Sequence, residues 1–296
     1  MFKTILVPLD GSANSEHSLA IAVSLAKRSS AVLRLVHVRE PMPERFGIAP
    51  PPKEQDYLDL LAWKIRQAAH LSIYATVLEG PVAPTIAEYA SSVNANLIVM
   101  TSHGRGPFSR FWLGGVADQL IRRAPAPLIV VRPPGDAVAG EPAKSDWKPG
   151  HILVALDGSK FAESVLHRVV ELAKLYGADL TLLRVVEPIP LLTPSGLEPQ
   201  PLILDSALLD ELKTQARTYL EAIADKLRKD GLSVSSRVLV DDRVAPAILE
   251  EGRDFDLMAL ATHGRHGVAR MILGSVTDKL VRGATEPVLV VPPEPH

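Results

Sequence analysis

The chain of 296 residues has room for about two domains of ordinary size, and its 47% of hydrophobic residues suffices for their cores. The net charge is −2, and no basic face of the kind that nucleic-acid-binding proteins present is evident. The absence of cysteine excludes disulfide bonds, thiolate metal ligands and cysteine nucleophiles. No apolar run approaches the roughly 18 residues of a membrane span, and the N-terminus opens with a strand pattern instead of a signal peptide. We therefore expect a cytoplasmic protein that has no membrane span and binds no nucleic acid.

An internal repeat runs through the whole chain. The offset between repeated residues is 147 at the start (157 − 10) and 160 near the end (264 − 104), so the second copy carries about 13 extra residues. The recurring segments are Ile5–Ser12 with Ile152–Ser159, Val38–Pro41 with Val185–Pro188, Val82–Pro84 with Val244–Pro246, Ser102–Arg105 with Thr262–Arg265, and Ala126–Val131 with Glu286–Val291.

The repeat divides the chain into two domains. Residues 1–133 form the first, called copy one here, and residues 150–293 form the second, copy two. Residues 134–149 are rich in Pro, Gly and Ala and are interpreted as a linker.

Short Val/Ile/Leu runs alternate with longer amphipathic stretches within each copy. Continuous apolar strands are typical of a parallel sheet that helices cover on both faces. The fold class is therefore α/β, with two tandem doubly wound, flavodoxin-like sheets of five parallel strands in the order 3-2-1-4-5. In copy two the expected strands are 151–157, 178–186, 233–240, 256–261 and 287–291, and the expected helices include 160–176 and 205–229.

Two further features are a proline-rich stretch in each copy and the apolar last strand of each copy. Proline-rich stretches at 41–52 and 188–201 are expected to be surface loops, either functional or inert. The apolar last strands, 128–131 and 288–291, would leave open sheet edges. We predict that these two strands face each other within the chain as a pseudo-twofold pair.

Candidate functional residues gather where two neighbouring strands end. Asp10 and Asp157 end the first strand of each copy, and Gly104 and Gly264 follow the fourth. In the expected strand order these strands flank the reversal point, where open α/β sheets bind ligands. Each aspartate either holds a ribose hydroxyl or a metal ion, or belongs to a turn whose Ser12 or Ser159 caps the next helix.

A glycine-led helix start follows the fourth strand. Gly264 precedes Gly274-Ser275-Val276 by nine residues, and unpaired N–H groups at such a helix start favour anions. Ser275 either donates its hydroxyl to a phosphate or caps the helix, with Asp278 echoing a capping box.

Other polar residues of this region give weaker signals. Arg105, Arg110, Arg265 and Arg270 recur at matching places and can neutralise phosphate charge or lie solvated. His103, His263 and His266 lack the further ligands that a metal site needs. Catalytic signature motifs are missing, and no base–nucleophile pair recurs, so we expect no enzyme with efficient turnover.

The segment Ala261–Arg265, followed nine residues after Gly264 by Gly274-Ser275-Val276, resembles the universal stress protein motif G-x-x-G-(x9)-G-[ST]. The opening and closing strands of both copies resemble the same family, in its tandem arrangement. The resemblance implies ATP binding without a metal site of the protein's own, any Mg²⁺ being carried on the bound phosphates, and it implies paired domains that mimic a homodimer. It places nucleotide contacts on Asp10, Val38, Met100, His103, Gly104, Gly114, Gly115 and Val116 in copy one, and on Asp157, Val185, Leu260, His263, Gly264, Gly274, Ser275 and Val276 in copy two, beside Arg265.

The sequence departs from that motif in both copies. Thr101 and Ala261 replace its first glycine, and Gly115 stands where Ser or Thr would offer a hydroxyl. Losing one such hydrogen bond costs about 0.5–1.5 kcal/mol, roughly threefold to tenfold in affinity, so copy two is expected to bind better. The expected function is an ATP-binding stress-response regulator with little or no hydrolysis, acting on an unidentified protein partner. The alternatives are a nucleotide-independent scaffold and a slow ATPase or adenylating enzyme.

Overall fold

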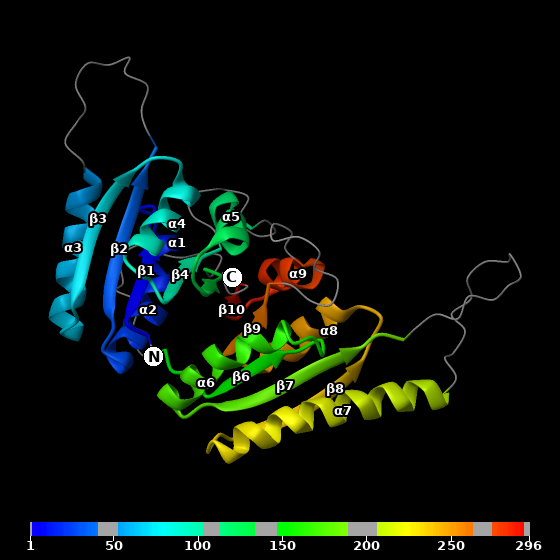
Figure 1. Ribbon diagram of the computed structural model, residues 1–296. Helices are drawn as coiled ribbons and strands as arrows, with labels where there is room; N and C mark the ends of the chain where they lie inside the picture. Colours follow the sequence, from blue (N-terminus) through cyan, green and yellow to red (C-terminus); the bar gives the residue numbers. More distant parts are fainter. Residues whose placement is uncertain are drawn as a thin grey trace, which may run out of the picture.

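The computed structural model describes residues 2–40, 53–102, 113–133, 147–188, 206–262 and 274–292. Strands and helices alternate along both copies, and the two copies lie side by side (Figure 1). Copy one contains β1 (Thr4–Pro8), α1 (Ala13–Glu16), α2 (Ser18–Ser29), β2 (Val32–Arg39), α3 (Lys53–Ala69), β3 (Ile73–Glu79), α4 (Val82–Ser92), β4 (Leu97–Thr101), α5 (Gly115–Arg123) and β5 (Leu128–Val131).

Copy two repeats this order with a longer helix before its third strand. Its elements are β6 (His151–Ala155), α6 (Val165–Tyr176), β7 (Asp179–Val186), α7 (Ser206–Lys229), β8 (Val234–Val240), α8 (Val244–Glu251), β9 (Leu257–Ala261), α9 (Ser275–Gly283) and β10 (Val288–Val291).

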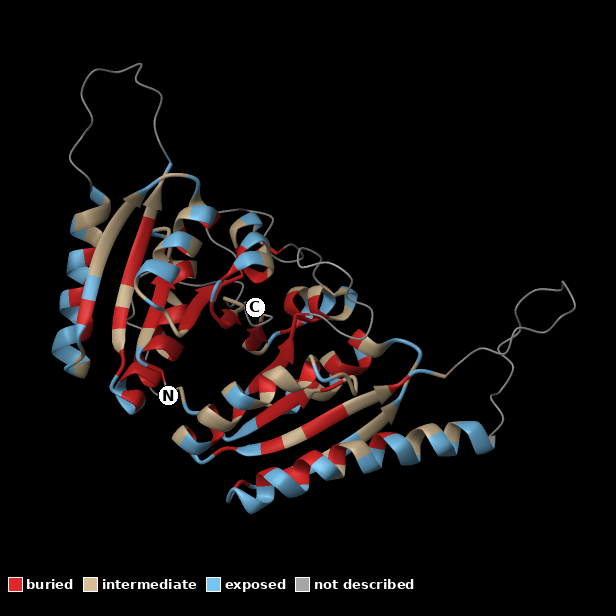
Figure 2. Ribbon diagram, viewed as in Figure 1, coloured by how far each residue is buried: buried red, intermediate tan, exposed pale blue. Residues whose placement is uncertain are grey.

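All ten strands belong to one sheet, in the order β3-β2-β1-β4-β5-β10-β9-β6-β7-β8. Strand pairs within each copy are parallel, and each copy has the predicted order 3-2-1-4-5. Strands β4 and β9 are buried along their whole length, as expected for parallel strands that helices cover on both faces (Figure 2). The predicted fold class is confirmed.

The copies meet through β5 and β10, which pair antiparallel. The register places Ile129 opposite Leu289, and it places Leu128 opposite Val290 and Val130 opposite Val288. Ile129 and Leu289 occupy equivalent positions of the repeat (129 + 160 = 289), so a pseudo-twofold axis passes through this central pair. The predicted pairing of the two last strands is confirmed.

Each face of the sheet carries one continuous apolar layer. One layer joins side chains from α2, α3, α6 and α7, and the other joins α4, α5, α8 and α9. Along the central strands the side chains alternate between the layers: Ile129 and Leu289 enter the first, and their neighbours Leu128, Val130 and Val288 enter the second. Both cores therefore run across the boundary between the copies.

A polar cluster reinforces that boundary in the first layer. The Ser24 hydroxyl of α2 donates to the Trp147 carbonyl at 2.5 Å and lies 3.0 Å from the Tyr176 hydroxyl of α6. The Trp147 and Tyr176 rings pack edge to face with centroids 5.4 Å apart, and the Arg28 guanidinium lies 4.9 Å from the Tyr176 ring centroid. Trp147, at the end of the sequence interpreted as a linker, thus fills a place between α2 and α6.

Two of the expected element boundaries need correction. The helix expected over 160–176 begins only at Val165, because Ala162–Ser164 form a 3-10 turn. The strand expected over 151–157 ends at Ala155, and the chain enters a tight turn at Gly158 after one more backbone hydrogen bond, from the Leu156 N–H to the Leu183 carbonyl at 2.9 Å. The helix expected over 205–229 is confirmed as α7, and the two proline-rich stretches lie almost wholly outside the described residues. No helix in the described part of the chain is long and apolar enough to cross a membrane.

Alkaline pH is expected to weaken the fold through Tyr176. Burial raises the pKa of Tyr176 to about 12, against 10.0 for an unperturbed tyrosine. The neutral phenol is thus favoured in the folded state, and its contribution is full below pH 10 and is lost as pH rises through 12. Urea denaturation across this range should show the free energy of unfolding falling with pH, and the fall should be smaller in Tyr176→Phe. An equal fall in both proteins would contradict this assignment.

Candidate functional site

Each copy has a tight Asp-Gly-Ser turn after its first strand. In copy one the Asp10 Oδ1 accepts hydrogen bonds from the Ser12 backbone N–H at 2.9 Å and the Ser12 hydroxyl at 2.6 Å. The Ser12 hydroxyl oxygen in turn accepts from the Ser15 N–H at 3.2 Å and caps α1. Gly11 has φ 79°, a left-handed conformation that favours glycine.

Copy two repeats this turn. The Ser159 N–H donates to Asp157 Oδ1 at 2.8 Å, and the Ala162 N–H donates to the Ser159 hydroxyl oxygen at 3.0 Å. Gly158 has φ 87°. The capping interpretation is thus confirmed for Ser12, whereas Ser159 accepts from the first residue of a 3-10 turn and is not the N-cap of α6, which is Ser164. Each aspartate helps to build its turn. A contact of either aspartate with a ligand stays a prediction.

The helix start after the fourth strand lies at the same edge of the sheet. In copy two Val154 pairs with Ala259, and three residues further along each strand the chain reaches Asp157 and Thr262. The Thr262 carbonyl accepts a hydrogen bond from the Gly274 N–H at 3.0 Å. The register and this hydrogen bond together bring the aspartate turn and the glycine-led helix start to neighbouring positions.

Copy one has the same arrangement. Leu6 pairs with Ile98, and four residues further along lie Asp10 and Ser102. The Ser102 carbonyl accepts from the Gly114 N–H at 2.9 Å. The convergence predicted from the strand order therefore occurs twice.

The helices α5 and α9 begin without a side-chain cap. Gly114 and Gly274 occupy the N-cap positions, and neither helix has a side-chain cap hydrogen bond within the described residues. The interpretation of Ser275 as a cap is therefore wrong, because Ser275 is already the first helical residue, and it is exposed. Gly274 has φ −58° and ψ 141°, a conformation open to any residue, so backbone strain does not require glycine there.

The apolar residues of the predicted site share one side of the sheet. Met100 and Leu260 are buried at the ends of β4 and β9 and belong to the layer under α4, α5, α8 and α9. The partly buried valines Val38, Val116, Val185 and Val276 pack against that same layer. The remaining predicted residues, namely His103, Gly104, His263, Gly264 and Arg265, lie outside the described residues.

A tyrosine–glutamate pair recurs beside each aspartate turn and was missed in the sequence. The Tyr57 hydroxyl of α3 donates to Glu16 Oε1 at 2.9 Å, and the Tyr219 hydroxyl of α7 donates to Glu163 Oε1 at 3.2 Å. Burial, then the paired glutamate and the nearby Asp10 or Asp157, raise the pKa of each tyrosine. The available signal was the Tyr-Leu dipeptide, which recurs with the same offset as the Val-Ala-Pro segment (219 − 57 = 162 and 244 − 82 = 162).

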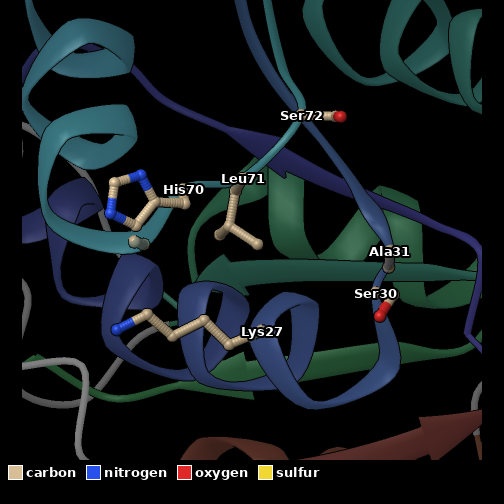
Figure 3. Close-up of a pocket in the computed structure, with 7 residues that line it drawn as sticks. Lys27, Ser30, Ala31, His70, Leu71 and Ser72 are labelled. Carbon is tan, nitrogen blue, oxygen red and sulfur yellow. The ribbon is translucent and has the colours of Figure 1, made fainter.

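A cavity of about 230 Å³ in copy one lies away from this site (Figure 3). Lys27, Ser30, His70 and Ser72 are among its lining residues, at the ends of α2 and α3 and just before β2 and β3. It therefore belongs to the amino edge of the parallel strands, opposite the aspartate turns. Within the described ranges, no group of three or more His, Asp or Glu side chains could hold a metal ion.

These features define a class: tandem doubly wound α/β domains, each with an aspartate turn and an uncapped glycine-led helix at the strand reversal. The model of the universal stress protein family matches residues 1–132 and 149–292. The chain belongs to the universal stress protein family, with two tandem domains of it.

Known relatives and structures agree with this assignment. Universal stress protein Rv2005c of Mycobacterium tuberculosis is 26% identical, covering 97% of this chain and 96% of its own length. Universal stress protein Rv1996 of the same organism is 28% identical, covering 98% and 96%. The crystal structure of a universal stress protein from Archaeoglobus fulgidus has a TM-score of 0.67 at 20% identity, covering 98% of this chain and 96% of that one, and so shares the fold.

The aspartate turn and the start of α5 should respond oppositely to the same substitution. Gly158→Ala places a Cβ at φ 87° and should lower the free energy of unfolding by about 1–2 kcal/mol. Gly115→Ala adds a Cβ that meets nothing within 4 Å and should raise stability by about 0.4–1 kcal/mol. Chemical denaturation of both variants measures the difference. Equal effects would mean that the turn does not need its glycine.

Proposed function

We propose that this protein is a cytoplasmic, ATP-binding regulator of the stress response, with one nucleotide site at the strand reversal of each copy. The observation that carries the proposal is the convergence of Asp157 with the start of α9, and of Asp10 with the start of α5. The aspartate turn and the glycine-led helix start come together in both copies, although copy two has 13 more residues between these two elements than copy one. The regulator is proposed to act through a protein partner and without efficient catalysis.

Each end of the site suits a different part of ATP. The Asp157 carboxylate is proposed to accept a hydrogen bond from a ribose hydroxyl, and the backbone of Val185 to contact adenine. At the other end, the uncapped N–H groups of α9 and the positive end of its dipole favour phosphate. The exposed Ser275 hydroxyl, which caps nothing, is available to donate to a phosphate oxygen.

The same roles are assigned to the rest of the predicted set. Gly264, His263 and Arg265 are proposed to complete the phosphate end in copy two, as Gly104 and His103 are in copy one. Mg²⁺ would accompany ATP through the bound phosphates instead of a cluster of protein carboxylates. Met100 and Leu260 would close the apolar side.

A nucleotide-independent scaffold is the second candidate, and particular residues favour it. Gly115 lacks the hydroxyl that Ser275 offers, and Thr101 and Ala261 replace glycines of the family motif. In that case the aspartate would serve only its turn, where Asp157 Oδ1 already accepts from Ser159.

Heat denaturation with ATP separates the two candidates. At 100 times its dissociation constant, ATP should add about 2.7 kcal/mol to the free energy of unfolding for each occupied site. Gly274→Val is expected to abolish the copy-two contribution, since its branched side chain blocks close approach of phosphate while φ −58° and ψ 141° suit valine. Gly114→Val does the same in copy one. No shift with ATP, ADP or AMP would reject the nucleotide proposal and leave the scaffold.

The residues at the first helical position should set the affinity of each copy. Gly115→Ser, for which the new side chain has open space, should strengthen ATP binding to copy one about threefold to tenfold. Ser275→Gly should weaken copy two by a similar factor. Calorimetry isolates copy one in a Gly274→Val background and copy two in a Gly114→Val background. Unchanged affinities would show that no phosphate bond is made from this position.

A further inference from the structure

The C-terminal end of α9 is held by a residue of copy one. Arg132, which directly follows β5, donates from Nη1 to the Arg282 carbonyl at 3.0 Å and to the Ala284 carbonyl at 3.2 Å. These carbonyls belong to the end of the helix, where backbone acceptors lack helical partners and a positive charge opposes the helix dipole favourably. Arg132 thus caps a helix of the other copy.

A second contact joins the same helix to copy one. The Arg282 Nε donates to Asp278 of the same helix at 2.9 Å. The Arg282 Nη2 lies 3.4 Å from Oδ1 of Asp118, which belongs to α5 of copy one. Asp118 also accepts from Arg122 at 3.1 Å. The side chains of Arg282 and Asp118 are only 31% and 27% exposed, so solvent screens this pair less than an open surface pair.

The arginine cap has no counterpart at the equivalent position of copy two. The offset that relates Gly114 to Gly274 takes Arg132 to Pro292 (132 + 160 = 292), whose side chain has no donor. Among the described residues the arginine cap therefore acts in one direction, from copy one onto α9.

The start of α9 is also tied to its strand. The buried Thr277 hydroxyl donates to the Ala261 carbonyl at 3.1 Å, and Ala117 stands at the equivalent place in copy one. The nine residues of α9 are therefore fixed at both ends, by β9 at the first turn and by copy one at the last.

We propose that Arg132 and Asp118 of copy one are positioning residues for the nucleotide site of copy two. This inference rests on the proposed function, because Gly274 and Ser275 at the start of α9 are the proposed phosphate contacts. A short helix moves as a unit, so loosening its end lets its first turn shift, and phosphate binding at close approach depends on that position. The copy-two site is thus complete only in the fused chain.

The test uses the full chain in the Gly114→Val background, where copy two alone binds ATP. Arg132→Gln should weaken ATP binding measured by calorimetry by about threefold to tenfold, and Arg132→Lys, which keeps a donor and the charge, should recover part of the loss. Asp118→Asn should act in the same direction. Arg123→Gln, a change at an exposed arginine in the last turn of α5, is the matched control and should leave the affinity unchanged.

Two further readouts separate positioning from general destabilisation. In the Gly274→Val background, Arg132→Gln should leave the affinity of copy one unchanged. Hydrogen exchange of the α9 amides should quicken in Arg132→Gln while the exchange of β4 and β9 stays the same. An ATP affinity that is unchanged in Arg132→Gln, or that is reduced equally in both copies, would overturn the inference but not the proposed function. Failure of the unmodified chain to bind ATP would overturn the proposed function and the inference with it.

Discussion

The antiparallel pairing of β5 with β10 is the constraint on which the rest of the molecule depends. Three Cα pairs centred on Ile129 and Leu289 turn two sheets with apolar edges into one ten-stranded sheet. Because equivalent residues meet at the centre, each copy presents the same strand to the other, as in an isologous dimer. The pairing also sets α5 and α9 next to each other on one face, and α2 next to α6 on the opposite face.

The fold could be predicted from the sequence because its signals are local and occur twice. Continuous apolar runs identify parallel strands, and the repeat shows which runs are equivalent, so strand order and central pairing follow from general rules. The start of α6 was harder to predict from the sequence. The choice between a 3-10 turn and an α-helix at Ala162 depends on how the Ser159 turn is closed. The pairs Tyr57–Glu16 and Tyr219–Glu163 were missed because they join segments 41 and 56 residues apart through ordinary residue types.

In the candidate site, too, the topology could be predicted from the sequence and the local geometry could not. That Asp157 and Gly274 share an edge follows from the position of β6 and β9 at the strand reversal, which the sequence predicts. Whether Ser275 caps α9 could not be decided, because Ser and Gly at adjacent positions are both good N-caps. The structure assigns the cap to Gly274, and this frees the Ser275 hydroxyl from a structural role in the helix.

Fusion of the two copies permits differences that a homodimer of identical chains does not. In a homodimer one residue must serve both equivalent positions, whereas here Arg132 corresponds to Pro292, Ala117 to Thr277 and Gly115 to Ser275. In each of these three cases the added hydrogen-bonding side chain acts on α9 or belongs to it. The helix of copy two gains a cap from copy one, a buried bond to β9 and an exposed hydroxyl at its first residue, while α5 has the smaller residue at the two matching positions. The asymmetry is therefore concentrated on one helix, as expected if copy one supports the proposed site that has the additional hydroxyl, at the start of α9.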